Sequence, residues 1–249
     1  MNGGEHEISS GNSELAFFIA KYDNNANLIW AKTMSGNGTG TGNLISIDEK
    51  GDIYAVGTFS GTIQFETQSM TAASVENTDN FLVKYAADGS MAWARSLKGS
   101  KLDDINAMDV ANHQVVIGGV IRSEDLAVDN APGILMKTLD TTGTWNSMLI
   151  ISFDTDGNYQ WNYIAGSSNQ PTDVKTIAIE KDGSIWNAGT TFGTYYFNPD
   201  AEDEAKQFPS KAKGGQDMYL MKLSSKGGSV DRTPCGRCNQ GRSNGNGGR

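Results

Sequence analysis

A strand–turn–strand pattern that repeats along the chain is the feature that most limits its fold. Three segments of equal length end in tryptophan: KYDNNANLIW (21–30), KYAADGSMAW (84–93) and SFDTDGNYQW (152–161). Each follows or begins in an apolar run, and its middle is rich in Asn, Asp and Gly, which tolerate the left-handed backbone of tight hairpin turns. A fourth apolar run ends near Lys222, but position 231, nine residues later, is Asp. Each segment predicts a hairpin whose tryptophan packs between neighbouring sheets. The alternative is a tryptophan surface that stacks on sugar rings.

A second repeated unit lies between these hairpins, in residues 44–61, 105–123 and 174–193. Its three copies align at Gly57, Gly119 and Gly189, with alternating apolar residues on both sides of a turn. Alternation with a period of two residues is typical of half-buried strands. A glycine late in the second strand indicates that another backbone approaches closely at that point.

Together the two units predict four strands per repeat, at 44–48, 52–59, 80–86 and 91–97 in the first complete copy. Gly57 and Gly119 are 62 residues apart, and Gly119 and Gly189 are 70 apart. The connections between the second and third strands are long (60–79, 122–147 and 194–216), so we expect additional short strands, for example at 62–65 and 194–197. No segment has sustained helical apolar spacing. The sequence therefore predicts an all-β protein.

Four-stranded antiparallel units repeated around an axis are the blades of β-propellers. The strings AKYDNNANLIWAK (20–32) and SIDEKGDIYAVGTFSG (46–61) resemble the bacterial seven-bladed β-propeller repeat of the SBBP type. The resemblance covers about residues 15–225, and the middle copy departs from it with HQVVIGGVIRS (113–123). It implies propeller blades and an extracellular or cell-surface location.

The predicted organisation is an array of about three and a half blades, which we expect to form an incomplete ring. The predicted parts are an N-terminal segment (1–14), a half blade (15–35), three blades (about 43–98, 104–166 and 173–225) and a tail (226–249). The net charge of the chain is −9; the tail carries +4, so residues 1–225 carry −13. Its one aliphatic residue, Val230, buries too little apolar area to offset ordering entropy. We predict that the tail is disordered and forms no part of a blade.

Composition excludes several kinds of function. The net charge of −9 argues against nucleic-acid binding, and no segment has the ~20 apolar residues of a membrane span. Cys235 and Cys238 form a C-x-x-C pair without a second pair, and His6 and His113 are far apart in sequence. We interpret the cysteines as incidental thiols, with an intermolecular zinc site, a disulfide or a redox role as alternatives. No cofactor and no metal are expected.

Candidate ligand-binding residues fall in the long connections. Trp145 is a candidate for an exposed contact, and an acidic cluster in the third connection offers carboxylates for a cation or for glycosidase chemistry. The cluster consists of Asp200, Glu202, Asp203 and Glu204. We favour a solvated loop for the cluster. Asp154 and Asp156 resemble the start of a calcium loop, but a hairpin turn is the simpler interpretation.

The function that we expect is a non-catalytic binding or scaffold module of an exported or cell-surface bacterial protein. Its loops at 122–147 and 194–216 would contact a protein or glycan partner, and further blades would lie in the same or another chain. One alternative is a fragment of a carbohydrate-active enzyme with carboxylates on the propeller rim. Another is a structural spacer between other domains.

Overall fold

The computed structural model describes residues 8–11, 13–74, 76–167, 169–196 and 209–233. The regular elements in these ranges are all β-strands, and their pairings are antiparallel, which confirms the all-β prediction. The described part of the chain contains no helix with the length and apolar character of a membrane span.

Most of the strands form a hairpin and three larger sheets. The N-terminal hairpin is β1 (Phe18–Tyr22) and β2 (Leu28–Thr33). Sheet I has β4 (Thr39–Ile47), β5 (Ile53–Ser60), β8 (Asp79–Tyr85) and β9 (Met91–Lys98), extended at β9 by β12 (Leu126–Val128) and β13 (Leu135–Met136). Sheet II has β10 (Asp104–Ala111), β11 (Gln114–Ile121), β14 (Ser147–Asp154) and β15 (Tyr159–Ala165). Sheet III has β16 (Thr176–Ile179), β17 (Ile185–Tyr196), β18 (Pro209–Leu223) and β19 (Ser229–Thr233).

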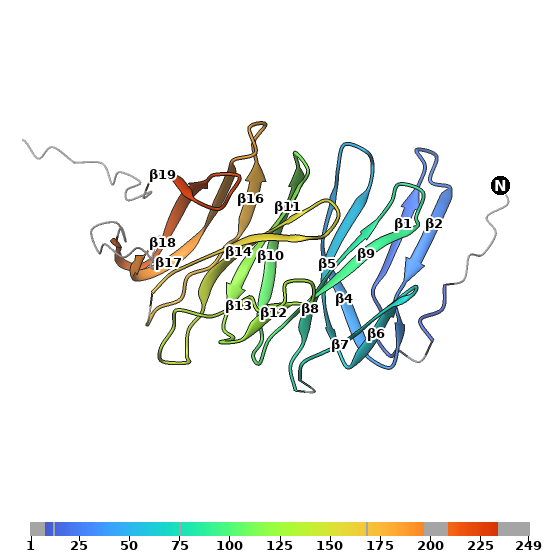
Figure 1. The fold of residues 1–249 in the computed structure, drawn as a ribbon, viewed down its shortest axis with the longest axis horizontal. Helices are drawn as coiled ribbons and strands as arrows, with labels where there is room; N and C mark the ends of the chain where they lie inside the picture. The colour runs from blue at the N-terminus through green and yellow to red at the C-terminus, as the bar shows by residue number, and fades with distance from the viewer. Residues whose placement is uncertain (1–7, 12, 75, 168, 197–208, 234–249) are drawn as a thin grey trace, which may run out of the picture.

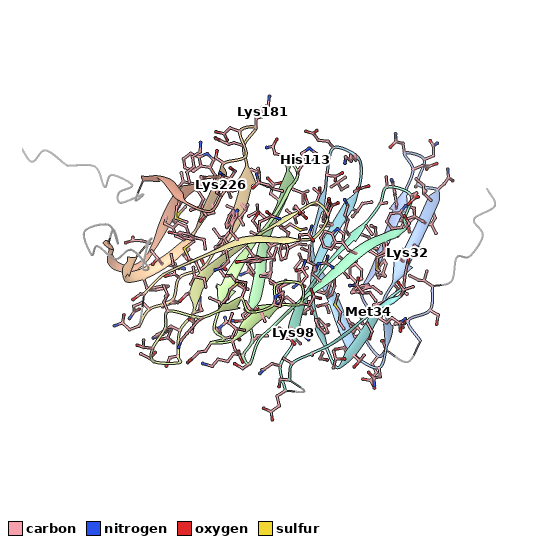
Figure 2. All side chains as sticks on the ribbon, in the orientation of Figure 1. Lys32, Met34, Lys98, His113, Lys181 and Lys226 are labelled. Carbon is pink, nitrogen blue, oxygen red and sulfur yellow. The ribbon has the colours of Figure 1, made fainter. Side chains whose placement is uncertain are left out.

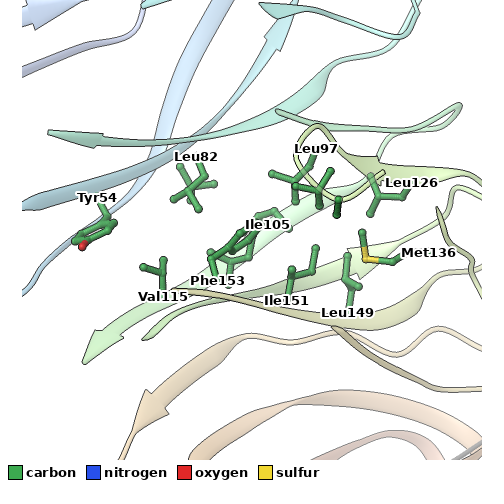
Figure 3. Packing of buried hydrophobic residues seen from close by; sticks show 14 of the residues in the cluster. Tyr54, Leu82, Leu97, Ile105, Val115, Leu126, Met136, Leu149, Ile151 and Phe153 are labelled. Carbon is green, nitrogen blue, oxygen red and sulfur yellow. The ribbon is translucent and has the colours of Figure 1, made fainter. Parts of the chain in front are cut away.

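The sheets lie side by side in a row, with the N-terminal hairpin at one end and sheet III at the other (Figure 1). The backbones of consecutive sheets come closest along their first strands, β4 against β10 and β10 against β16. Each space between neighbours holds its own apolar core. Figure 3 shows the core between sheets I and II, where Tyr54 and Leu82 face Val115 and Phe153. The cores between sheets thus hold the array together.

The long connections pack against the sheet that precedes them. In the first connection, β6 (Thr62–Phe65) and β7 (Gln68–Thr71) form a small sheet with β3 (Ser35–Gly36), which follows the N-terminal hairpin. In the second, β12 pairs with β9 of sheet I. The short strand predicted at 62–65 is therefore present as β6. Residues 194–196 of the strand predicted at 194–197 are also in a strand, but they continue β17 and pair with the start of β18 instead of forming a separate strand; residue 197 lies outside the described residues.

The prediction that the tail contributes nothing to a repeat is also wrong. Residues 229–233 form β19, which pairs with β18 and gives sheet III its fourth strand. The turn before β19 is a tight one, with Gly227 at φ 82° and its N–H donating to the carbonyl of Ser224. A strand at a sheet edge is held by backbone hydrogen bonds, which need no apolar side chain. The sequence search missed it because it required a tryptophan at position 231.

The repeated glycines lie where the first and second strands of each sheet approach. A Cβ atom on Gly57 would lie 1.9 Å from the carbonyl oxygen of Thr41. The corresponding distances are 1.9 Å from Gly119 to the Asp104 oxygen and 2.0 Å from Gly189 to the Asp173 oxygen. The first strand has a register shift opposite Gly57 and near Gly119. Only glycine fits at these three positions.

Candidate functional site

Each repeated tryptophan joins its own sheet to the next one along the row. The indole N–H groups of Trp30, Trp93 and Trp161 donate to the carbonyl oxygens of Ala87, Thr155 and Ser225, at 3.3, 3.1 and 3.0 Å. Each acceptor lies in the last hairpin turn of the following sheet. A glycine in the same turn lies under the indole. A Cβ on Gly89, Gly157 or Gly227 would be 2.8, 2.6 or 2.8 Å from a ring atom. We call this arrangement the tryptophan–glycine contact.

A lysine supports this contact at the interface of sheets I and II. Lys84 is paired with Trp93 across the strands, and its Nζ donates to the same Thr155 oxygen at 3.1 Å. Its ammonium also lies 3.0 Å from the Asp52 carboxylate and 5.1 Å from the centre of the Tyr54 ring. Burial raises the pKa of Tyr54 to about 12. For Lys84, burial lowers the pKa, but hydrogen bonds with Tyr54 and Asp52 leave it above its ordinary value.

The equivalent positions between sheets II and III carry smaller side chains. Ser152 replaces the lysine and is paired with Trp161, and Val116 replaces the tyrosine. The turn between β10 and β11 is also shorter, with Asn112 and His113 both at positive φ. A pocket of about 480 Å³ opens here, lined by residues that include His113, Ser152, Asp154, Trp161 and Lys226. Figure 2 shows His113 and Lys226 on the same side of the molecule.

Two buried polar atoms of this pocket have no hydrogen-bond partner. They are the Oγ atom of Ser152, whose residue is 1% exposed, and the Oε1 atom of Gln114. The amide nitrogen of Gln114 donates to the carbonyl of Gly183 at 3.3 Å, which fixes the side chain in place. The sequence analysis did not select Ser152. The available signal was the serine itself, since Lys21, Lys84 and Lys222 occupy that position in the other copies.

The two end sheets of the row expose apolar faces. On the N-terminal hairpin, Phe18 and Tyr22 are 65% and 59% exposed, on the opposite side from buried Ile19. On sheet III, Met218 and Leu220 are 67% and 40% exposed and alternate with buried Tyr219 and Met221. Each end of the row therefore has large apolar side chains exposed on its outer face.

The structure places Trp145 apart from this pocket and the acidic cluster outside its described ranges, whereas Asp154 lines the pocket. Trp145 is exposed, and its backbone N–H donates to the Asp140 carboxylate at 2.6 Å. The acidic cluster lies in 197–208, and Cys235 and Cys238 lie in 234–249; both segments are outside the described residues. Asp154 accepts the backbone N–H groups of Asp156 and Asn158 at 3.0 and 2.8 Å, as in a hairpin turn. Within the described ranges, no group of three or more His, Cys, Asp or Glu side chains could hold a metal ion.

Comparison with known proteins gives a distant relative. The chain is 27% identical over 152 residues to the regulatory protein FlaEY of Caulobacter vibrioides. The matched residues are 60% of this chain, and they span about 15% of the length of that protein. No family model matches the chain.

Proposed function

We propose that the chain is a non-catalytic scaffold module, a propeller-like array that binds a protein partner by stacking sheet on sheet at its ends. The observation that carries this proposal is that exposed residues of the end faces match, by repeat position, residues that are buried inside the array. The resemblance to SBBP-type repeats adds blades around an axis and an extracellular or cell-surface location to the proposal.

The N-terminal end face repeats a face of sheet I. By repeat position, Phe18 and Tyr22 correspond to Phe81 and Tyr85, which are fully buried against the N-terminal hairpin. The aromatic residues that pack between sheets inside the array therefore lie exposed at its first strand. Burial of such a side chain contributes about 1.5–3 kcal/mol.

The other end face repeats the opposite face of sheet I. Leu220 corresponds to Leu82, which is fully buried against sheet II. The lysine–aromatic contact of Lys84 and Tyr54 also has a counterpart here. The ammonium of Lys222 lies 5.4 Å from the centre of the Trp186 ring and pairs with Glu180. Hydrogen bonds from Lys222, Trp186 and Ser184 lower the pKa of Glu180. This face has the composition of one that packs onto a following sheet.

The turn residues at the two ends match as well. Inside the array, each tryptophan lies over a glycine of the next sheet, whereas the first turn has Ala26 at the glycine position, with φ 62°. At the other end, position 231 is Asp rather than Trp. When the two ends meet, the methyl group of Ala26 does not have to fit under an indole ring, because the facing strand has no tryptophan at position 231. The two end faces are thus suited to each other, in a head-to-tail contact between copies or with further blades.

Association of copies in solution tests the proposal. Wild-type protein should form dimers and longer species as its concentration rises, measured by analytical ultracentrifugation. Phe18→Lys at one end and Leu220→Lys at the other should each prevent it, because a charge would be buried without a partner. A mixture of the two variants should form dimers and nothing larger, since one intact end remains on each.

Leu135→Lys is the matched control, because Leu135 is an exposed leucine of β13 away from both ends. It should associate like the wild type. A wild-type protein that stays monomeric at every concentration would contradict the proposal, and so would association that the two end variants do not change.

A further inference from the structure

We infer that the pocket between sheets II and III is a binding site for a neutral saccharide. This site is separate from the end faces, so it stands or falls independently of the proposed scaffold function. The inference starts from a local exception in the repeat, Ser152 and Val116 in place of lysine and tyrosine.

The exception creates the pocket. In sheet I, the Lys84 and Tyr54 side chains occupy the corresponding space and contact each other, and Lys84 also pairs with Asp52. In sheet II, the short Ser152 lines a pocket of about 480 Å³ at this place, and Val116 is packed in the core between sheets II and III. Ligand pockets in proteins are commonly about 300–1,000 Å³. The space is therefore large enough for a small ligand.

The two unpartnered atoms define what such a ligand must offer. Buried polar atoms without partners are rare in native proteins and each costs roughly 1–3 kcal/mol. The Oε1 atom of Gln114 accepts hydrogen bonds only, so the ligand must carry a donor. The hydroxyl of Ser152 both donates and accepts. Hydroxyl groups on a ring satisfy both atoms, whereas an ionised carboxylate cannot donate to Gln114.

The walls of the pocket fit an uncharged ring. Trp161 lines the pocket, and its indole is held in place by the bond to Ser225 and by Gly227 beneath it. A fixed aromatic side chain beside polar groups makes the wall of the pocket partly apolar and partly polar. A sugar ring is partly apolar and partly polar in the same way, so the two surfaces match. The carboxylate of Asp154 and the ammonium of Lys226 offset each other in charge. These features favour a neutral saccharide over an ion.

The experiment is a titration of the isotope-labelled full chain with three neutral disaccharides, maltose, cellobiose and N,N′-diacetylchitobiose, followed by nuclear magnetic resonance. The indole N–H signal of Trp161, assigned with Trp161→Phe, should shift and saturate with at least one disaccharide. Ser152→Ala removes the hydroxyl without adding volume, so it should weaken binding by about tenfold, equivalent to about 1.4 kcal/mol.

Ser152→Lys restores the side chain of the other repeats and should abolish binding by filling the pocket. We expect its Nζ to reach the Ser225 carbonyl as Lys84 reaches Thr155, so the melting temperature should rise and show that the variant is folded. Ser90→Lys, in an exposed turn of sheet I, adds the same charge elsewhere and should bind like the wild type. The inference is overturned if none of the disaccharides shifts the Trp161 signal saturably, or if Ser152→Lys still binds.

Discussion

The interface between sheets I and II and the interface between sheets II and III use equivalent strands but fill the space between them differently. The first has Tyr54, Lys84 and a Trp93 that is almost fully buried. The second has Val116, Ser152 and a partly exposed Trp161 beside a pocket. The tryptophan–glycine contact is common to both, so it sets the spacing of the sheets. The residues around it decide whether an interface is closed or keeps room for a ligand.

The largest expected effect separates the two tryptophans. Trp93→Ala should lower the free energy of unfolding by about 3–5 kcal/mol, as for other buried aromatic residues. Trp161→Ala should cost about 2 kcal/mol, because part of its ring already faces the pocket rather than protein atoms. Urea denaturation followed by far-ultraviolet circular dichroism measures both. Equal losses for the two variants would show that the pocket does not reduce the packing of Trp161.

The next effect comes from the lysine that distinguishes the first interface. Lys84→Ser should lower the free energy of unfolding by about 2–3 kcal/mol, because it leaves the partly buried Asp52 carboxylate without its cation and Thr155 with one donor fewer. Lys21→Ser is the matched control, since Lys21 donates to the Ala87 carbonyl at 2.7 Å in the interface between the N-terminal hairpin and sheet I. Lys21→Ser should lower the free energy of unfolding by about 1 kcal/mol. The comparison also requires a second measurement, one that reports how open the space around Trp93 is.

That readout is the access of solvent to Trp93. In Lys84→Ser, acrylamide should quench tryptophan fluorescence more strongly than in the wild type, because the variant reproduces the serine of sheet II beside Trp93. Lys21→Ser should leave the quenching of Trp93 unchanged. If Lys84→Ser costs no more than Lys21→Ser and adds no quenching, the lysine is not what closes the first interface.

The strands of this protein were predictable from its sequence because their signals are local and repeated. Alternating apolar residues and Asn, Asp or Gly turns placed β5, β8 and β9 within one residue at each end, whereas β4 begins five residues before its predicted start. The fourth strand of sheet III was missed for the opposite reason. It is held by backbone pairing to β18, and a backbone hydrogen bond leaves no mark in the side-chain pattern.

The pocket could not be predicted, because it is defined by what is missing between two sheets. Ser152 was visible as a departure from the lysine of the other repeats, but its consequence depends on residues far away in the chain that line the same space, among them His113 and Lys226. Cavities arise from summed volumes of residues that are distant in sequence. A break in a repeat is therefore a useful place to look for a site, although the sequence alone does not say whether neighbours fill the space.

The smallest effect concerns a buried charge on the connection from sheet I to sheet II. Asp103 is 2% exposed and accepts the backbone N–H groups of Arg122 and Ser123 at 2.7 and 3.0 Å. Burial raises its pKa, against the lowering effect of these hydrogen bonds. The equivalent position before sheet III is the neutral Thr172, whose hydroxyl lies 3.2 Å from that of Thr191.

Because the pKa of Asp103 is higher in the folded than in the unfolded chain, its contribution to stability is complete below the unfolded value, near 3.9. It is lost as the pH rises through the folded value. Asp103→Asn should therefore gain in stability relative to the wild type as the pH rises through this range, measured by urea denaturation at a series of pH values. Thr172→Val, at the other interface, should change stability by the same amount at every pH. If the stability of the wild type and that of Asp103→Asn change in parallel with pH, the buried charge does not distinguish the two interfaces.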